Sequence, residues 1–119
     1  GLWVNEPQFS CVYTKLHYNT HMERYFEWDE EKAENNFRKH GIRFEEAALV
    51  FDDPFAVSKC ERVENGEQRW QTIGVSCGFL LMLVAHTVHS ESAGIEVLRI
   101  ISARRVDRKE RKQYENGSI

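Results

Sequence analysis

The spacing of the apolar residues changes once along this chain, at Pro54, and this change constrains the fold more than any other feature. Before Pro54, apolar residues recur at helical spacing over residues 29–40 and 44–51. After Pro54 the spacing shifts to two, which is typical of half-buried strands. The strand segments are 55–61, 68–76, 79–88 and 95–105, with turn residues at Asn65-Gly66, Cys77-Gly78 and 90–94. The sequence therefore predicts two helices followed by an antiparallel meander.

One predicted strand precedes this pattern, and one predicted helix follows it. Residues 24–28 alternate as a strand does, and Asp29 is a good N-cap for the helix that Gly41 ends. Near the C-terminus, Asp107 and Glu110 form a capping-box pattern for a basic helix. The expected order is β-α-α-β-β-β-β-α, an α+β domain with an antiparallel sheet, two N-terminal helices and one C-terminal helix. The segment 79–85 is apolar at successive positions, so it should occupy the middle of the sheet.

The length of 119 residues fits one domain. Residues 1–21 show no helical period and precede Met22, so we expect them to be an N-terminal leader outside the domain 22–119. The chain has no apolar run of about 18 residues, which predicts no membrane span. Its three cysteines are widely spaced and form no Cys-x-x-Cys pair, which favours a reducing cytoplasm.

The charge is distributed unevenly. The net charge of the chain is −3, but residues 22–67 carry −6 whereas residues 68–119 carry +3. Basic side chains crowd the last strand and helix, which is compatible with a phosphate-facing patch. The expected RNA-binding residues there are Arg105, Arg108, Lys109, Arg111 and Lys112. Charge alone explains this helix equally well as a solvated face.

The Cys77-Gly78 turn predicts which residues face each other. A two-residue loop would pair Ser76 with Phe79, and that register places Arg69 opposite His86. Directly opposed side chains are close enough to share one phosphate or one proton-transfer path. If the next turn also aligns Arg99 with His86 or Val84, an Arg-His-Arg cluster forms on three neighbouring strands.

Such a cluster suits RNA cleavage. Guanidinium groups bind phosphate and stabilise its growing charge, and histidine moves protons near neutral pH. The structural alternative is that Arg69 and Arg99 pair with carboxylates and that His86 is a satisfied core histidine. Strict alternation on the last strand would direct Arg99, Ile101, Ala103 and Arg105 to one face and Ser102 and Arg104 to the other.

Other histidines point less clearly to chemistry. His86 and His89 are three residues apart, and such residues on a strand face opposite sides, which argues against one metal ion bound by both. Lys39 and His40 suit the negative end of the first helix, so helix capping explains them as well as catalysis does. The sequence thus predicts no metal and no cofactor.

Three segments of the chain resemble the BrnT toxin family: residues 26–54 with RKHG before the second helix, RWQTIG at 69–74, and RIISAR at 99–104 followed by RKERKQYENG. The resemblance covers nearly all of residues 24–117. It implies a RelE-like fold and a bacterial ribonuclease that suppresses translation. It also implies a BrnA-type antitoxin, through which the complex reaches operator DNA.

The resemblance carries the family's characteristic polar residues onto this chain. The candidate catalytic residues are Lys39, His40, Arg69, His86, Arg99, Ser102 and Arg104. Trp28, Phe37, Phe44 and Phe51 should serve the core. The competing interpretation is a binding module without catalysis, which docks an antitoxin or nucleic acid through its basic last strand and helix.

Overall fold

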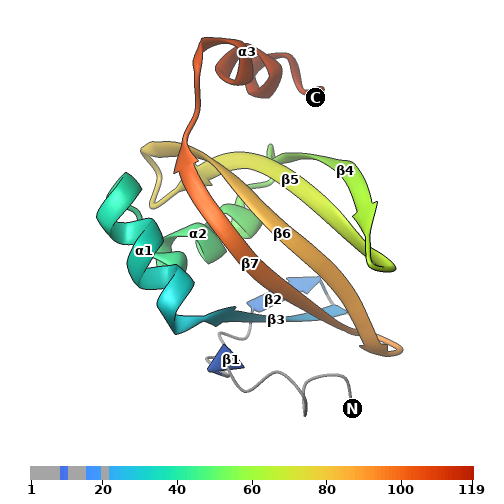
Figure 1. Ribbon diagram of the computed structural model, residues 1–119. Coiled ribbons are helices and arrows are strands. Elements are labelled where there is room, and N and C mark those ends of the chain that lie inside the picture. The colour runs from blue at the N-terminus through green and yellow to red at the C-terminus, as the bar shows by residue number, and fades with distance from the viewer. Residues whose placement is uncertain (1–8, 11–15, 20–21) are drawn as a thin grey trace.

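The computed structural model describes residues 9–10, 16–19 and 22–119. Five strands form the main sheet in the order β3-β7-β6-β5-β4, and two helices pack on one of its faces while a third lies beyond the end of β7 (Figure 1). The elements of the domain are β3 (Met22–Asp29), α1 (Glu30–His40), α2 (Phe44–Ala48), η2 (Leu49–Asp52), β4 (Val57–Glu64), β5 (Glu67–Ser76), β6 (Leu80–Ser92), β7 (Ile95–Arg105) and α3 (Arg108–Asn116). The predicted element order and the α+β class are confirmed.

Most of the predicted leader lies outside the described residues. Within it, β1 (Phe9–Ser10) and β2 (Leu16–Asn19) both pair antiparallel with β3. None of the helices in the described ranges has the length and apolar character that a membrane span requires.

The helix boundaries follow the predicted caps. The Asp29 side chain accepts from the backbone N–H groups of Glu31 and Lys32, and Gly41 ends α1 in the left-handed region, with φ 71°. Asp107 and Glu110 form the expected capping box of α3. The second predicted helix is shorter than expected, because α2 tightens into the 3₁₀ turn η2 after Ala48.

The prediction of an entirely antiparallel sheet is wrong at one edge. β3 runs parallel to β7, pairing Glu23–Glu27 with Ile95–Arg99, whereas β4, β5, β6 and β7 pair antiparallel in sequence. The chain returns to β3 only after a long excursion, so turn residues carried no information about this pairing. Beyond Glu27, α1 takes the place of β3 beside β7, where buried Asn36 exchanges hydrogen bonds with the N–H and C=O of Ala103.

The two sheet faces have separate cores. On the face that we call the helix face, α1, α2 and η2 cover Phe26, Trp28, Val84, Leu98 and Ile100. The opposite face, called the arginine face, buries Ile73, Leu81 and Leu83 against Val106 and Tyr114, which come from the C-terminal segment. Three of the four predicted core aromatics are buried, but Phe37 is 39% exposed, under the guanidinium of Arg43 at 4.1 Å.

The β5–β6 register is shifted by one residue from the prediction. Cys77 and Gly78 form the expected tight turn with positive φ, and the N–H of Phe79 bonds to the carbonyl of Ser76. Phe79 is then an extra, 81% exposed residue, so the ladder starts with Ser76 opposite Leu80. Because side chains alternate between faces, this single residue moves every later side chain of β6 to the other face.

A second irregularity corrects the prediction for β7. His86 pairs with Ile100 and Ala85 with Ser102, so Ile101 is inserted as a bulge. The bulge puts Ser102 and Arg104 on the same face as Arg99, instead of on the opposite face. Arg105 pairs with Met82 of the helix-face core, so it does not share the face of Arg99 as predicted, and the cations of this strand on the arginine face are Arg99 and Arg104.

Candidate active site

Arg69 and Arg99 lie side by side on the arginine face. Arg69 pairs across the ladder with Thr87 of β6, and Thr87 pairs with Arg99 of β7. Both guanidinium groups reach one oxygen of Glu67: the distances from Nη2 to Oε1 are 2.5 Å for Arg99 and 3.7 Å for Arg69. Two cations on non-adjacent strands thus converge on a single anionic oxygen.

The two arginines differ in how fully they are bonded. Arg99 is 9% exposed and has Glu27 of β3, itself buried, beside it in the β3–β7 register. Arg69 touches Glu64 and Glu67 only at 3.8 and 3.7 Å, beyond hydrogen-bonding distance. Its buried Nε has no hydrogen-bond partner among the described residues. Arg69 therefore retains capacity to bind another acceptor.

Sequence reasoning missed Glu64 and Glu67. They flank the Asn65-Gly66 turn, whose two residues both have positive φ, and they pair directly with each other. That turn type is the strongest hairpin signal in the chain, so it could have placed Glu67 two residues from Arg69 on the same face.

His86 is not opposite Arg69, contrary to the prediction. It pairs with Trp70 and lies on the helix face, 2% exposed, with the Phe51 ring edge-on at 4.8 Å between centroids. The structural reason is the extra residue Phe79. The predicted Arg-His-Arg cluster therefore does not form.

The hydrogen bonds of His86 fix its protonation. Its Nδ1 lies 3.2 Å from the carbonyl oxygen of Thr87, which only accepts, so Nδ1 carries the proton. Nε2 then accepts from the hydroxyl of Thr72 at 2.7 Å. Burial lowers the pKa of His86 to about 4, so the ring is neutral near physiological pH.

Lys39, His40 and Ser102 come together at the edge of the sheet. They line a groove of about 230 Å³ between the end of α1 and the β7 bulge, with Asn36 and Ile101. The helix end thus brings its cations to the strand that carries Arg99. In the described chain no three His, Cys, Asp or Glu side chains gather as metal ligands do.

Arg104 lies further along β7 and is engaged by α3. Its guanidinium donates to both oxygens of Glu110, at 2.8 Å each. The hydrogen bond to Glu110 raises the pKa of Arg104, and the same contact lowers the pKa of Glu110. The other basic residues of the C-terminal segment have exposed side chains; they are Arg105, Arg108, Lys109, Arg111 and Lys112.

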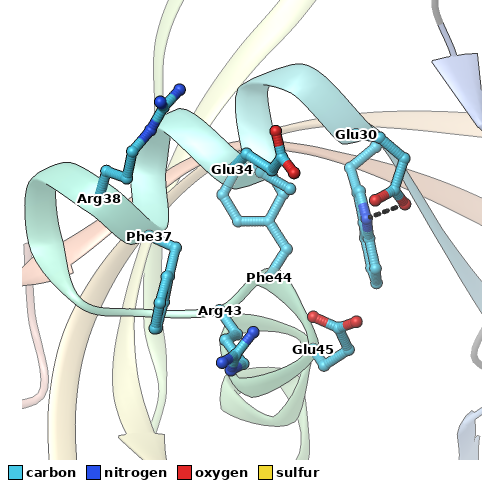
Figure 2. Close-up of a pocket in the computed structure, with 9 residues that line it drawn as sticks. Glu30, Glu34, Phe37, Arg38, Arg43, Phe44 and Glu45 are labelled. Carbon is cyan, nitrogen blue, oxygen red and sulfur yellow. Dashed lines mark hydrogen bonds between the residues drawn. The ribbon is translucent and has the colours of Figure 1, made fainter.

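A wider groove of about 440 Å³ lies between α1 and α2 (Figure 2). Figure 2 shows the rings of Phe37 and Phe44 between the two helices, with the carboxylates of Glu34 on α1 and Glu45 on α2 near them. No predicted site residue lines this groove. It is separate from the residues expected to carry chemistry.

Comparison with known proteins adds the family. The crystal structure of the Brucella abortus ribonuclease toxin BrnT is similar to this chain, with 23% sequence identity and a TM-score of 0.46 over 68% of this chain and 94% of that chain. No curated protein matches. The family model described as the ribonuclease toxin BrnT of type II toxin-antitoxin systems matches residues 28–110. The chain therefore belongs to the BrnT ribonuclease toxin family.

Proposed function

We propose that this protein is a metal-independent endoribonuclease whose scissile phosphate binds between Arg69 and Arg99. The observation that carries the proposal is the convergence of both guanidinium groups on one oxygen of Glu67. A phosphate oxygen that displaces this carboxylate meets two cations from separate strands. Guanidinium groups so placed stabilise the charge that develops on phosphate during cleavage.

The reaction uses the RNA itself as the nucleophile. The 2′-oxygen attacks phosphorus and the bond from phosphorus to the 5′-oxygen breaks, which yields a 2′,3′-cyclic phosphate and a 5′-hydroxyl. Glu67, once displaced, is the carboxylate beside the phosphate and accepts the proton of the 2′-hydroxyl. Lys39 or His40, across the groove from Ser102, donates a proton to the leaving 5′-oxygen.

His86 has no direct part in this scheme. It lies on the opposite face, neutral and 2% exposed. Arg104 binds the RNA chain next to the cleavage point, and the exposed cations of the C-terminal segment bind further phosphates. Because these contacts are ionic, binding weakens as salt concentration rises.

The biological role follows from the family. A toxin of a type II toxin-antitoxin system has a protein antitoxin, and we propose a BrnA-type antitoxin that covers the basic surface. Cleavage of RNA by the uncovered toxin inhibits translation. Operator DNA is contacted only by the complex, through the antitoxin.

Purified protein incubated with RNA in the presence of a chelator tests the proposal. We expect unchanged cleavage with chelator and fragments that carry a cyclic phosphate and a 5′-hydroxyl. Cleavage abolished by the chelator, or 5′-phosphate ends, would refute the mechanism. Absence of any cleavage by folded protein would favour a binding module instead.

A further inference from the structure

A pocket of about 290 Å³ opens on the helix face, on the half of the sheet that α1 and α2 leave uncovered. Its walls combine two aromatic rings, Trp70 and Phe51, with an ion pair in which Arg24 Nε lies 2.9 Å from Glu96 Oε1. The proposed cleavage chemistry uses none of these side chains. The pocket is therefore a second site that needs its own explanation.

The polar wall of this pocket offers acceptors. Because His86 Nδ1 donates to Thr87, the hydroxyl of Thr72 must donate to His86 Nε2. Thr72 Oγ1 then accepts from Ser58 Oγ, 2.7 Å away. The single hydroxyl proton of Ser58 is used in this contact, so Ser58 presents only lone pairs to a ligand.

The ion pair of Arg24 and Glu96 places a carboxylate and a guanidinium side by side in the pocket wall. Arg24 and Glu96 have side chains 18% and 20% exposed, so both are partly desolvated and still accessible. A carboxylate accepts two parallel N–H bonds, and a guanidinium donates to acceptors next to them. A ligand that fits both must be planar, with two adjacent donors on one edge and acceptors on the next.

Guanine has this pattern. Its N1–H and 2-amino group lie side by side, and O6 and N7 are acceptors. Adenine, uracil and cytosine all lack this pair of adjacent donors. Stacking on tryptophan holds any base, so the ion pair must provide the discrimination.

We propose that this pocket binds a guanine base, stacked on Trp70, with Glu96 accepting from N1–H and the 2-amino group and Arg24 donating to O6. Ser58 accepts a further N–H at the pocket wall. Arg69 and Trp70 are consecutive on β5, so the pocket and the arginine pair lie on the two sides of one strand. Only the assignment of the guanine to substrate RNA rests on the proposed function; a free guanine nucleotide has the same base.

Titration of the whole protein with GMP, AMP, CMP and UMP, followed by tryptophan fluorescence, tests the proposal. We expect GMP to bind about tenfold more tightly than the other three, as a bidentate base contact provides. Trp70→Phe should keep the preference and remove the fluorescence change that arises in the pocket, because the other tryptophan among the described residues, Trp28, is 1% exposed. Equal binding of all four nucleotides, or no binding at millimolar concentration, would overturn the proposal.

Two variants and one control test which side chains cause the preference for GMP. Glu96→Gln supplies one acceptor where guanine needs two, so it should reduce the preference for GMP to less than about threefold. Glu45→Gln, an exposed carboxylate of the other groove, should leave it unchanged. Ser58→Ala, which removes an exposed hydroxyl, should weaken GMP binding a few-fold. A preference that survives in both Glu96→Gln and Ser58→Ala contradicts the assignment.

A second arm separates the sources of the base and the two proposals. A short RNA with one guanosine that binds more tightly than GMP identifies RNA as the source; equal affinity identifies a free nucleotide. Arg99→Ala should reduce the rate of cleavage by about 10² to 10³ and leave GMP binding intact. GMP binding without RNA cleavage would therefore refute only the proposed function, and cleavage without GMP binding would refute only the guanine site.

Discussion

Both faces of the sheet carry side chains of types that can catalyse RNA cleavage. The two faces differ in how accessible these side chains are and in how fully they are hydrogen-bonded. On the helix face, His86 is buried, neutral and hydrogen-bonded at both ring nitrogens. On the arginine face, Arg69 has a side chain that is 21% exposed and an Nε without a hydrogen-bond partner among the described residues, and it shares the carboxylate of Glu67 with Arg99. The difference shows that chemical type alone does not identify a site; accessibility and unspent bonding capacity do.

The largest expected effect is on the rate of RNA cleavage, which variants on the two faces should change by different amounts. Arg99→Ala should reduce the rate of RNA cleavage by about 10² to 10³, the usual loss when one group that stabilises transition-state charge is removed. His86→Gln should reduce the rate of the folded protein less than about tenfold. Gel-based cleavage rates at equal concentrations of folded protein provide the measurement, with Arg38→Ala on α1 as the control.

The opposite order of cleavage rates would contradict the assignment of the reaction to the arginine face. If His86→Gln abolished cleavage while Arg99→Ala retained it, the reaction would belong to the helix face. Circular dichroism of each variant ensures that a loss of rate is not a loss of fold.

The next effect concerns how the helix face is assembled. Asn36→Ala removes three buried hydrogen bonds, two to Ala103 and one to the carbonyl of Ile42, and leaves the backbone groups of Ala103 unsatisfied. We expect the free energy of unfolding to fall by about 2 to 4 kcal/mol. Asn35→Ala, one residue earlier and exposed, should change it by about 0.5 kcal/mol or less. Urea unfolding of both variants measures the difference. Equal losses would show that the hydrogen bonds between Asn36 and Ala103 do not contribute to the free energy of unfolding.

A pH dependence of stability tests the state of His86. Its pKa is about 4 in the folded protein and 6.5 in a model peptide, so the unfolded chain binds a proton that the folded one excludes. Stability should therefore be full above pH 6.5 and decline as pH falls from 6.5 towards 4, by at most about 3 kcal/mol. The unfolding free energy of wild type and His86→Gln, measured across this range, isolates the contribution. If the unfolding free energies of wild type and His86→Gln changed with pH in parallel, the imidazole of His86 would be solvated in the folded protein.

The fold was predictable where local signals determine it. Asp29, Gly41 and the Asp107 capping box set helix ends through contacts within a few residues, and Asn65-Gly66 sets a hairpin. The parallel pairing of β3 with β7 depends on residues about 70 positions apart, and no local pattern encodes it. Tertiary contact, not propensity, decides such pairings.

The candidate site was less predictable, because it depends on register. One extra residue, Phe79, moved His86 to the other face, and the bulge at Ile101 brought Ser102 and Arg104 onto the arginine face. Ile101 has no neighbouring glycine or proline to mark the bulge, and the Cys77-Gly78 turn before Phe79 indicates a hairpin without showing that Phe79 is an extra residue. Arg69 and Arg99 still share a face because both pair with the same residue, Thr87, from the two sides of β6.

The smallest expected effect concerns the attachment of α3 to the arginine face. Glu110 binds Arg104 through both oxygens and accepts from the N–H of Asp107 at 2.9 Å. Glu110→Ala removes the cap and the ion pair, and we expect a loss of about 1 kcal/mol, because the Arg104 side chain is 39% exposed and water screens the charges. Glu110→Gln keeps an acceptor for Asp107 and should lose about half as much. Unfolding at low and high salt distinguishes the two parts: the difference between the variants should persist in salt, whereas the loss in Glu110→Gln should shrink. If both variants lost as much as Asn36→Ala, α3 would be held as firmly as α1, and the arginine face would be as rigid as the helix face.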